Sequence, residues 1–478
     1  MATKSTPTAK NLETLGAARL AELLAEISEG STPLKRRLRL ELAGEESPGK
    51  LGHEIKKRLT ALDRSTAFVD WRGVKALAAD LDTQRRLICD KVAPAAPQEA
   101  CELMWRFLDL AESIFGRTDD GSGTLIGIFH QACRDLGPMA QSAGLAPQSL
   151  AERIVHCKLN NGYGQFDELI PSLRTALGQE GLSHLRTLLT RLADEPPAKI
   201  DPKNRRIIAY SLNGPMYEDA FAERHRRDTI RYALREVADA MGDVDAYIAQ
   251  HGDERRVPAI AARIAMRLLK AGRPEDALAA IDAVEEQRGD WIPVEWELTR
   301  IEALEALDRR DEAQAFRLDR FHRSLNADHL RAYLKRLPDF DDIEAEDAAM
   351  RHALDFSSVH HALAFLVEWP RLDAAADLIL SRQAQIDGDR YDILTPAAAK
   401  LEAKYPLAAT VVLRKMIDFA LDRGRSARYR HAARHLADCA SMAKRIDDFG
   451  SLPDHGAYVA RLKSSHGRKS GFWSAVDG

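Results

Sequence analysis

The sequence contains little of what disulfide-rich, membrane-spanning or β-rich proteins need. Its 478 residues include five cysteines, and aromatic residues make up 6% of the chain. No stretch approaches the roughly 18 consecutive apolar residues of a membrane span, and the N-terminal MATKSTPTAKN lacks the apolar centre of a secretory signal. The cysteines are scattered without close pairs, which favours reduced thiols and a cytoplasmic location. They are Cys89, Cys101, Cys133, Cys157 and Cys439.

Strand patterns are also scarce, and no charge of one sign dominates. Alternation of apolar and polar residues between hairpin turns is not found, whereas Ala, Leu and Arg are abundant, so we expect an all-α fold. The formal net charge is −4, which excludes a global attraction to nucleic acid or to anionic lipid. Local basic patches remain to be considered.

The clearest pattern is a helical pair within 263–284, RIAMRLLKAGRPEDALAAIDAV. Gly272 follows the last apolar position of the first helix and Pro274 starts the second, as expected for a tight connection between helices. Looser copies follow at 298–316 and 361–380, and a fourth pair is expected at 397–421 and 426–446. Ala277 and Ala313 lie 36 residues apart, close to the roughly 34 of a tetratricopeptide unit. The pattern predicts a degenerate helical-hairpin repeat, a tetratricopeptide-like α-solenoid.

Breaks in the pattern divide the chain into five segments. Glu195-Pro196-Pro197 is the strongest boundary signal, and residues 198–220 are expected to be irregular before a charged helix at about 216–241. The expected segments are a disordered N-terminus (1–10), an N-terminal helical domain (11–195), a connecting segment (196–257), the helical array (258–450) and a C-terminal tail (451–478).

Three phrases resemble a bacterial group of uncharacterised helical proteins. They are LAELLAEISEGSTPLKRRLRLELAG, FVDWRGVKALAADLD and YPLAATVVLRKMIDFALDRGRSARYRHAARHLADC. Similar segments accompany SWIM-type zinc fingers in other bacterial chains. The resemblance covers roughly the first 140 and the last 90 residues and implies a helical fold. Because the finger's CxC pair and Cys-x-His are absent here, it implies no zinc role.

Two arginine-rich segments are candidate binding surfaces. Arg224, Arg227, Arg231 and Arg235 share one helix face, where guanidinium groups bind phosphates or a partner, or else pair with nearby carboxylates. The second segment lies within 414–435. Its surface suits nucleic acid, an acidic protein or simple solvation. Its candidate residues are Arg425, Arg428, Arg430 and Arg434.

Signals for chemistry are weak. His431 and His435 are one helical turn apart, a spacing that can clasp a metal, but Cys439 is rotated away and no fourth ligand is evident. Neither a Walker loop, a GxSxG elbow, a GxGxxG loop nor an EF-hand is present. We therefore expect a non-enzymatic scaffold or regulatory protein that uses no cofactor and binds another protein. The alternatives are a nucleic-acid-associated protein and a metal-dependent enzyme.

Overall fold

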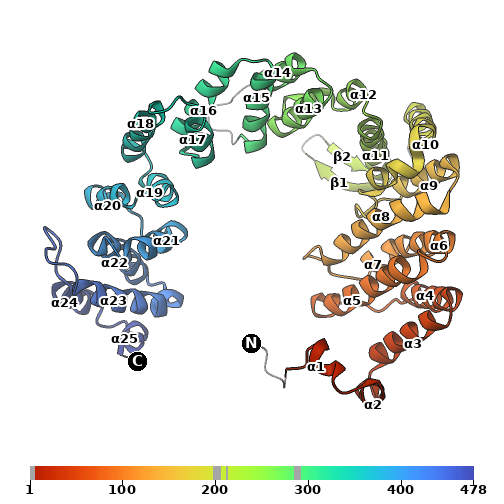
Figure 1. The fold of residues 1–478 in the computed structure, drawn as a ribbon, viewed down its shortest axis with the longest axis horizontal. Helices are drawn as coiled ribbons and strands as arrows, with labels where there is room; N and C mark the ends of the chain where they lie inside the picture. Colours follow the sequence, from red (N-terminus) through yellow and green to blue (C-terminus); the bar gives the residue numbers. More distant parts are fainter. Residues whose placement is uncertain (1–5, 198–205, 212–213, 285–291, 478) are drawn as a thin grey trace. The chain divides into compact units, whose positions relative to one another are not determined.

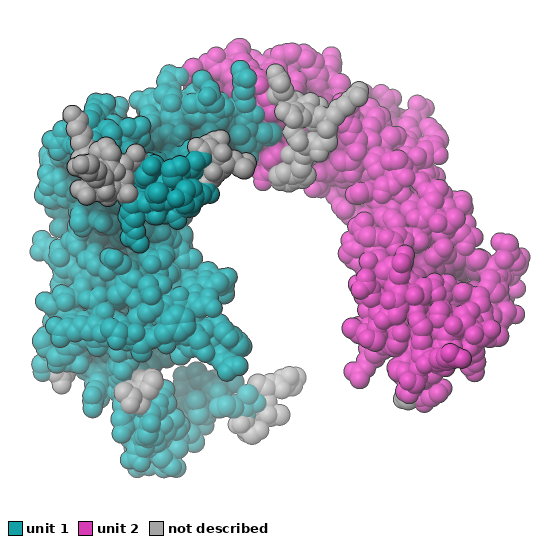
Figure 2. Space-filling view, turned by 180° about the vertical axis from the view of Figure 1, so that it is seen from behind, with its two compact units in different colours: residues 1–260 teal, residues 261–478 magenta. Residues whose placement is uncertain are grey.

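The computed structural model describes residues 6–197, 206–211, 214–284 and 292–477, and most of these residues are helical. The fold is therefore all-α, as the composition predicts. Contacts divide the chain into two compact units, residues 1–260 and residues 261–478 (Figures 1 and 2). None of the described helices combines the length and the hydropathy that crossing a membrane requires.

Unit 1 has one large apolar core, in which Trp105, Phe107 and Phe129 are fully buried. Residues on both sides of the Pro196-Pro197 signal belong to this unit, because α11 packs along α9 and α10. Its elements are α1 (Ala9–Glu13), α2 (Ala17–Ser28), α3 (Thr32–Glu46), α4 (Pro48–Asp63), α5 (Trp71–Leu87), α6 (Pro97–Leu108), α7 (Ala111–Phe115), α8 (Thr124–Ala143), α9 (Pro147–Leu159), α10 (Leu169–Asp194), β1 (Ile207–Ser211), β2 (Gly214–Tyr217), α11 (Glu218–Met241) and α12 (Val244–Ala249).

Unit 2 is a succession of helices around a second core that contains Phe321, Leu366, Tyr458 and Phe472. The segment 451–478, expected to be a tail, forms α24 and α25 and buries Tyr458, Leu462 and Phe472. The helices are α13 (Pro258–Lys270, whose first turn is counted with unit 1), α14 (Pro274–Asp282), α15 (Val294–Ala306), α16 (Arg310–Ser324), α17 (Ala327–Leu334), α18 (Asp341–Asp355), α19 (Val359–Glu368), α20 (Leu372–Ser381), α21 (Tyr391–Leu401), α22 (Pro406–Asp422), α23 (Tyr429–Ala443), α24 (His455–His466) and α25 (Ser470–Asp477).

The same turn connects several consecutive helices of unit 2. An arginine amide donates to a carbonyl five residues earlier, at 2.9 Å each time, which closes the C-terminus of the preceding helix. The donor and acceptor pairs are Arg273 and Leu268, Arg309 and Leu304, Arg371 and Leu366, and Arg425 and Ala420. Four residues after three of these arginines stands a fully buried alanine, where the two helices approach closely. These alanines are Ala277, Ala313 and Ala375.

The connection at Gly272 is formed as the sequence predicts. Gly272 has φ +72, in the left-handed region that glycine adopts without strain, and Pro274 is in the first turn of α14, where no backbone donor is needed. Ala277 is fully buried in α14.

Two expectations from the sequence are wrong. The region 198–220 was expected to be irregular, but β1 and β2 form an antiparallel hairpin in which Tyr210 pairs with Pro215. Its residues are exposed on both faces, with Tyr210 77% exposed, so no alternating pattern marked the strands. The single helix expected at 397–421 is two helices, because the chain turns before Pro406, whose ring fits only the first turn of α22.

The described chain begins at residue 6. Of the N-terminal segment 1–10 that was expected to be disordered, residues 1–5 lie outside the described residues, and α1 begins at Ala9 behind the cap of Thr8.

Candidate functional site

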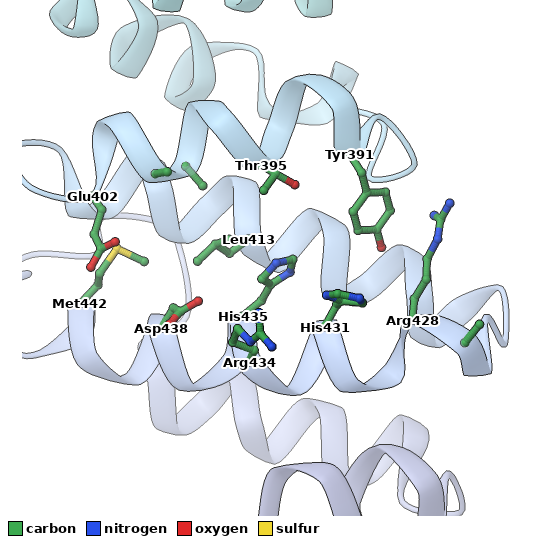
Figure 3. A pocket seen from close by; sticks show the side chains of 13 residues that line it. Tyr391, Thr395, Glu402, Leu413, Arg428, His431, Arg434, His435, Asp438 and Met442 are labelled. Carbon is green, nitrogen blue, oxygen red and sulfur yellow. The ribbon is translucent and has the colours of Figure 1, made fainter. Parts of the chain in front are cut away.

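A groove in unit 2 brings together most of the chemistry of the C-terminal basic segment. We call it the α21–α23 groove, since α21 and α23 form its walls while α22 packs against both and supplies Leu413 to its floor (Figure 3). Its volume is about 680 Å³, within the range of sites that hold a small molecule or a few side chains of a partner. The lining residues are Tyr391, Thr395, Ala398, Ala399, Glu402, Leu413, Ala427, Arg428, His431, Arg434, His435, Asp438 and Met442.

Helical spacing aligns the side chains along each wall. Tyr391, Thr395 and Ala398 of α21, and Glu402 directly after its last residue, recur at intervals that keep one face toward the groove. On α23, His431 and His435 share a face with Asp438 in the same way. The α21 wall was not predicted, although its helical spacing is visible in the sequence, because a single sequence does not say which helix packs against which.

One end of the groove is basic and aromatic. The Arg428 guanidinium pairs with the Asp389 carboxylate at 2.5 Å and lies 4.2 Å from the centre of the Tyr391 ring. The Tyr391 hydroxyl donates to the Met416 carbonyl of α22, which fixes the ring. Asp389 comes this close because Gly388 lies against the Lys415 carbonyl, a place where a β-carbon would collide.

The middle of the groove holds the residues with unused bonding capacity. Arg434 lines the groove, and no carboxylate in the described ranges lies within ion-pair distance of it. His435 is half-buried, and its Nδ1 is a buried nitrogen without a hydrogen-bond partner in the described part of the chain. Burial, together with the charges of His431 and Arg434, lowers the pKa of His435 to about 4. His435 is therefore neutral at pH 7 and offers a donor and an acceptor to an occupant.

The opposite end of the groove is acidic and apolar. Asp438 and Met442 of α23 face Glu402 at the C-terminal end of α21 (Figure 3). Glu402 lies 3.8 Å from Arg445. Charged side chains therefore stand at both ends of the groove, with the apolar floor between them, and Arg428 and Glu402 each already have an oppositely charged neighbour.

His431 and His435 lie on the same wall, as their spacing predicts. Across the described residues, no three His, Cys, Asp or Glu side chains come together in a way that could hold a metal ion. Cys439 is fully buried, and burial raises the pKa of its thiol to about 12. The histidines are therefore groove residues in this structure.

The arginine face of α11 is largely occupied by carboxylates. Arg227 pairs with Glu223 at 2.7 Å, and Arg231 lies 3.2 Å from Asp228 and 3.3 Å from Glu254. Hydrogen bonds from Arg226 and Arg227 lower the pKa of Glu223 to about 2. Of the four predicted residues, Arg224 alone is exposed without an ion pair in the described ranges. Arg226 was not among the predicted residues, yet it donates to the Leu192 and Glu195 carbonyls at the end of α10.

Arg235, the fourth predicted residue, lies 4.6 Å from the Tyr232 ring and lines a hollow of about 420 Å³ in unit 1. In this hollow Lys158 pairs with Glu236 at 2.6 Å. Burial raises the pKa of Glu236, and the attraction of Lys158 opposes that rise. Since its strongest charges neutralise each other, this hollow is a weaker candidate than the α21–α23 groove.

The basic residues around 414–435 have different surroundings. Arg425 and Arg430 are exposed and lie outside the groove, while Arg428 and Arg434 line it. Arg414, in the same basic run, is buried, donates to the Pro453 carbonyl at 2.7 Å and lies 4.4 Å from the Tyr458 ring. It belongs to the core.

The fold and the groove define an all-helical protein with a polar groove between neighbouring helices. The chain belongs to a family of unknown function, DUF6880, whose profile matches residues 2–475. No curated protein matches the sequence. The match covers nearly the whole chain and therefore spans both units. Its description mentions neither SWIM-type zinc fingers nor tetratricopeptide units, and those two resemblances stay predictions.

Proposed function

We propose that this chain is a non-enzymatic binding protein that holds an acidic, partly apolar segment of another protein in the α21–α23 groove. The observation that carries the proposal is the position of Arg434 and His435. An arginine without an ion pair in the described ranges and a histidine with an unsatisfied buried nitrogen line one hollow above an apolar floor. A carboxylate of the partner pairs with Arg434, and an apolar side chain covers Leu413 and Ala398.

The repeated turn of unit 2 supports a scaffold role. A tetratricopeptide-like array explains why the arginines at 273, 309, 371 and 425 make the same backbone bond and why buried alanines follow three of them. Their separations of 36, 62 and 54 residues make the array degenerate. Helical pairs of this kind bury one face against their neighbours and leave grooves between exposed faces, which bind peptide segments.

The state of the arginines favours a protein partner over nucleic acid. Phosphate binding requires several free cations in a row. Arg227, Arg231 and Arg428 already pair with carboxylates, and Arg414 is buried.

A labelled peptide tests the proposal directly. The probe is a fluorescein-labelled synthetic peptide of glutamate and leucine, compared with a version in which every glutamate is glutamine. We expect the acidic peptide alone to bind, and Arg434→Glu to weaken its binding about tenfold, because one partly desolvated ion pair is worth about 1.4 kcal/mol. Fluorescence anisotropy measures both constants.

The matched control is Arg430→Glu. Arg430 is an exposed arginine of the same helix outside the groove, so the same charge change there leaves binding nearly unaltered. Equal effects of the two variants, or no binding of the acidic peptide at about 1 mM, contradict the proposal. Binding of duplex DNA that weakens steeply above about 50 mM salt supports the nucleic-acid alternative instead. Stoichiometric zinc or iron in protein purified without a histidine tag supports the metal-dependent enzyme.

A further inference from the structure

The N-terminal helices of unit 1 carry an apolar face that none of the described residues covers. No side chain of α1 is buried, and in α2 the buried residue is Ser28. Leu24 and Ile27 of α2 are 50% and 62% exposed, and Leu20 and Leu23 are half-buried. The other end of the described chain differs, since α25 packs on α23 and buries Phe472 completely. An exposed apolar face of this kind promotes association with another surface.

The apolar residues of α2 have the heptad spacing that is typical of a helix that pairs with another helix. Leu20 and Ile27 occupy the first position of successive heptads, and Leu23 occupies the fourth. Arg19 and Glu26, seven residues apart, both occupy the position that flanks this seam on one side. Both are exposed. Arg19 forms a surface ion pair with Glu22 of its own helix, and replacing such a pair by another costs little free energy.

We propose that this α2 face binds the α2 face of a second copy of the chain in antiparallel orientation. The charges select that occupant. In an antiparallel pair the flanking positions of this side face each other, so Arg19 of each copy meets Glu26 of the other. If the two-fold axis passes near Leu23 and Leu24, Arg19 of one copy and Glu26 of the other are offset by two residues, which is about 3 Å along the helix axis. One interface then contains two equivalent opposite-charge pairs and no like-charge pair at this position.

A parallel pair lacks this complementarity. In a parallel pair, Arg19 and Glu26 of one copy face the opposite flanking position of the other copy. In α2 this position is occupied by Leu24, which carries no charge. An unrelated acidic or basic partner is also poorly matched, because one flank carries one charge of each sign. Self-pairing therefore satisfies both the apolar face and its charged edge.

The mass of the full chain in solution tests this proposal. Light scattering after size exclusion, from about 1 to about 100 µM, is expected to show twice the 53.2 kDa of one chain at the upper concentrations. The double variant Leu24→Glu with Ile27→Glu is expected to show the mass of a single chain at every concentration. The control is Leu298→Glu, which changes a 48% exposed leucine of α15 in unit 2 and is expected to leave the dimer intact. Circular dichroism of each variant establishes that it is folded.

Charge exchange tests the orientation. Arg19→Glu places two glutamates opposite each other at both ends and is expected to weaken association at least tenfold, as is Glu26→Arg. The double variant restores both opposite-charge pairs and is expected to restore the dimer. A single-chain mass at every concentration, or a dimer insensitive to Leu24→Glu with Ile27→Glu, overturns the proposal. A double variant as weak as the single variants overturns the antiparallel arrangement.

Discussion

Helix α11 and the basic segment that leads into α23 both carry several arginines, yet their surroundings give these arginines different properties. On α11, Arg227 and Arg231 are neutralised by carboxylates from the same helix and from the segment after it. On α23, Arg434 lines a groove without an ion pair in the described ranges. Part of this difference is already in the sequence, because Glu223 and Asp228 lie on α11 beside its arginines. The rest comes from what packs beside each helix, as Glu254 does beside Arg231.

The comparison extends to the helix before α23, where a basic run contains an arginine of the core. Arg414 is 6% exposed and lies between the Pro453 carbonyl and the Tyr458 ring. Charge density along the sequence therefore mixes three roles, which are core packing, surface pairing and groove lining. Substitutions of residues with different roles are therefore expected to change the stability of the protein by different amounts.

The largest expected effect concerns Arg414. Arg414→Ala removes a buried side chain from its contact with Tyr458 and leaves the Pro453 carbonyl without its donor, so we expect the free energy of unfolding to fall by about 3 kcal/mol. Arg414→Met keeps most of the volume and removes a cation that has no hydrogen-bonded carboxylate in the described ranges, so its cost is about 1 kcal/mol. Urea unfolding measures both values.

Arg425→Ala is the matched control, because Arg425 is an exposed arginine of the same basic segment. Its replacement changes the unfolding free energy by less than about 0.5 kcal/mol. If Arg414→Ala is as mild as Arg425→Ala, the assignment of Arg414 to the core is wrong.

The next effect concerns His435 and pH. Since the pKa of His435 is lowered to about 4 in the folded chain by burial, the folded state binds fewer protons than the unfolded state, whose pKa is about 6.5. Stability is therefore complete above about pH 6.5 and declines as pH falls toward 4. After allowance for solvent screening of this half-buried ring, the loss is about 1–2 kcal/mol.

Denaturant unfolding of the wild type and of His435→Gln at pH 7 and pH 4.5 isolates this contribution, because other titrating groups affect both proteins. His431→Gln removes one of the neighbouring charges that disfavour protonation, so we expect it to reduce the decline and not to abolish it. Equal pH dependence of the wild type and His435→Gln contradicts the buried, neutral ring.

The sequence allowed some features to be predicted and not others, for physical reasons. The connection at Gly272 and Pro274 was predictable because backbone preferences of glycine and proline act locally. The helical face of Arg224, Arg227, Arg231 and Arg235 was predictable from its period. The pairing of these arginines with Glu254, and the α21 wall of the groove, depend on contacts between elements distant in sequence. The hairpin at Ile207–Ser211 was missed because both of its faces are exposed.

The repeated turn illustrates the same limit. Ala277 and Ala313 were recognisable as equivalent because their pairs follow each other directly. The bond of Arg371 to Leu366 is geometrically the same, but the intervening helices α17 and α18 displace it by 62 residues from Arg309. A periodicity of fixed length does not detect a repeat interrupted by additional helices, whereas the backbone geometry does.

The smallest expected effect tests the α11 side of the comparison. Arg226→Ala removes the donor to the Leu192 and Glu195 carbonyls and one partner of Glu223, so we expect the unfolding free energy to fall by about 1 kcal/mol. Arg224→Ala, two residues away on the exposed side, changes it by less than about 0.5 kcal/mol. Thermal and urea unfolding of the two variants side by side measure the difference. An equal loss from both variants means that the arginines of α11 stabilise the helix by their charge in general, and that the bracing of α10 by Arg226 contributes nothing of its own.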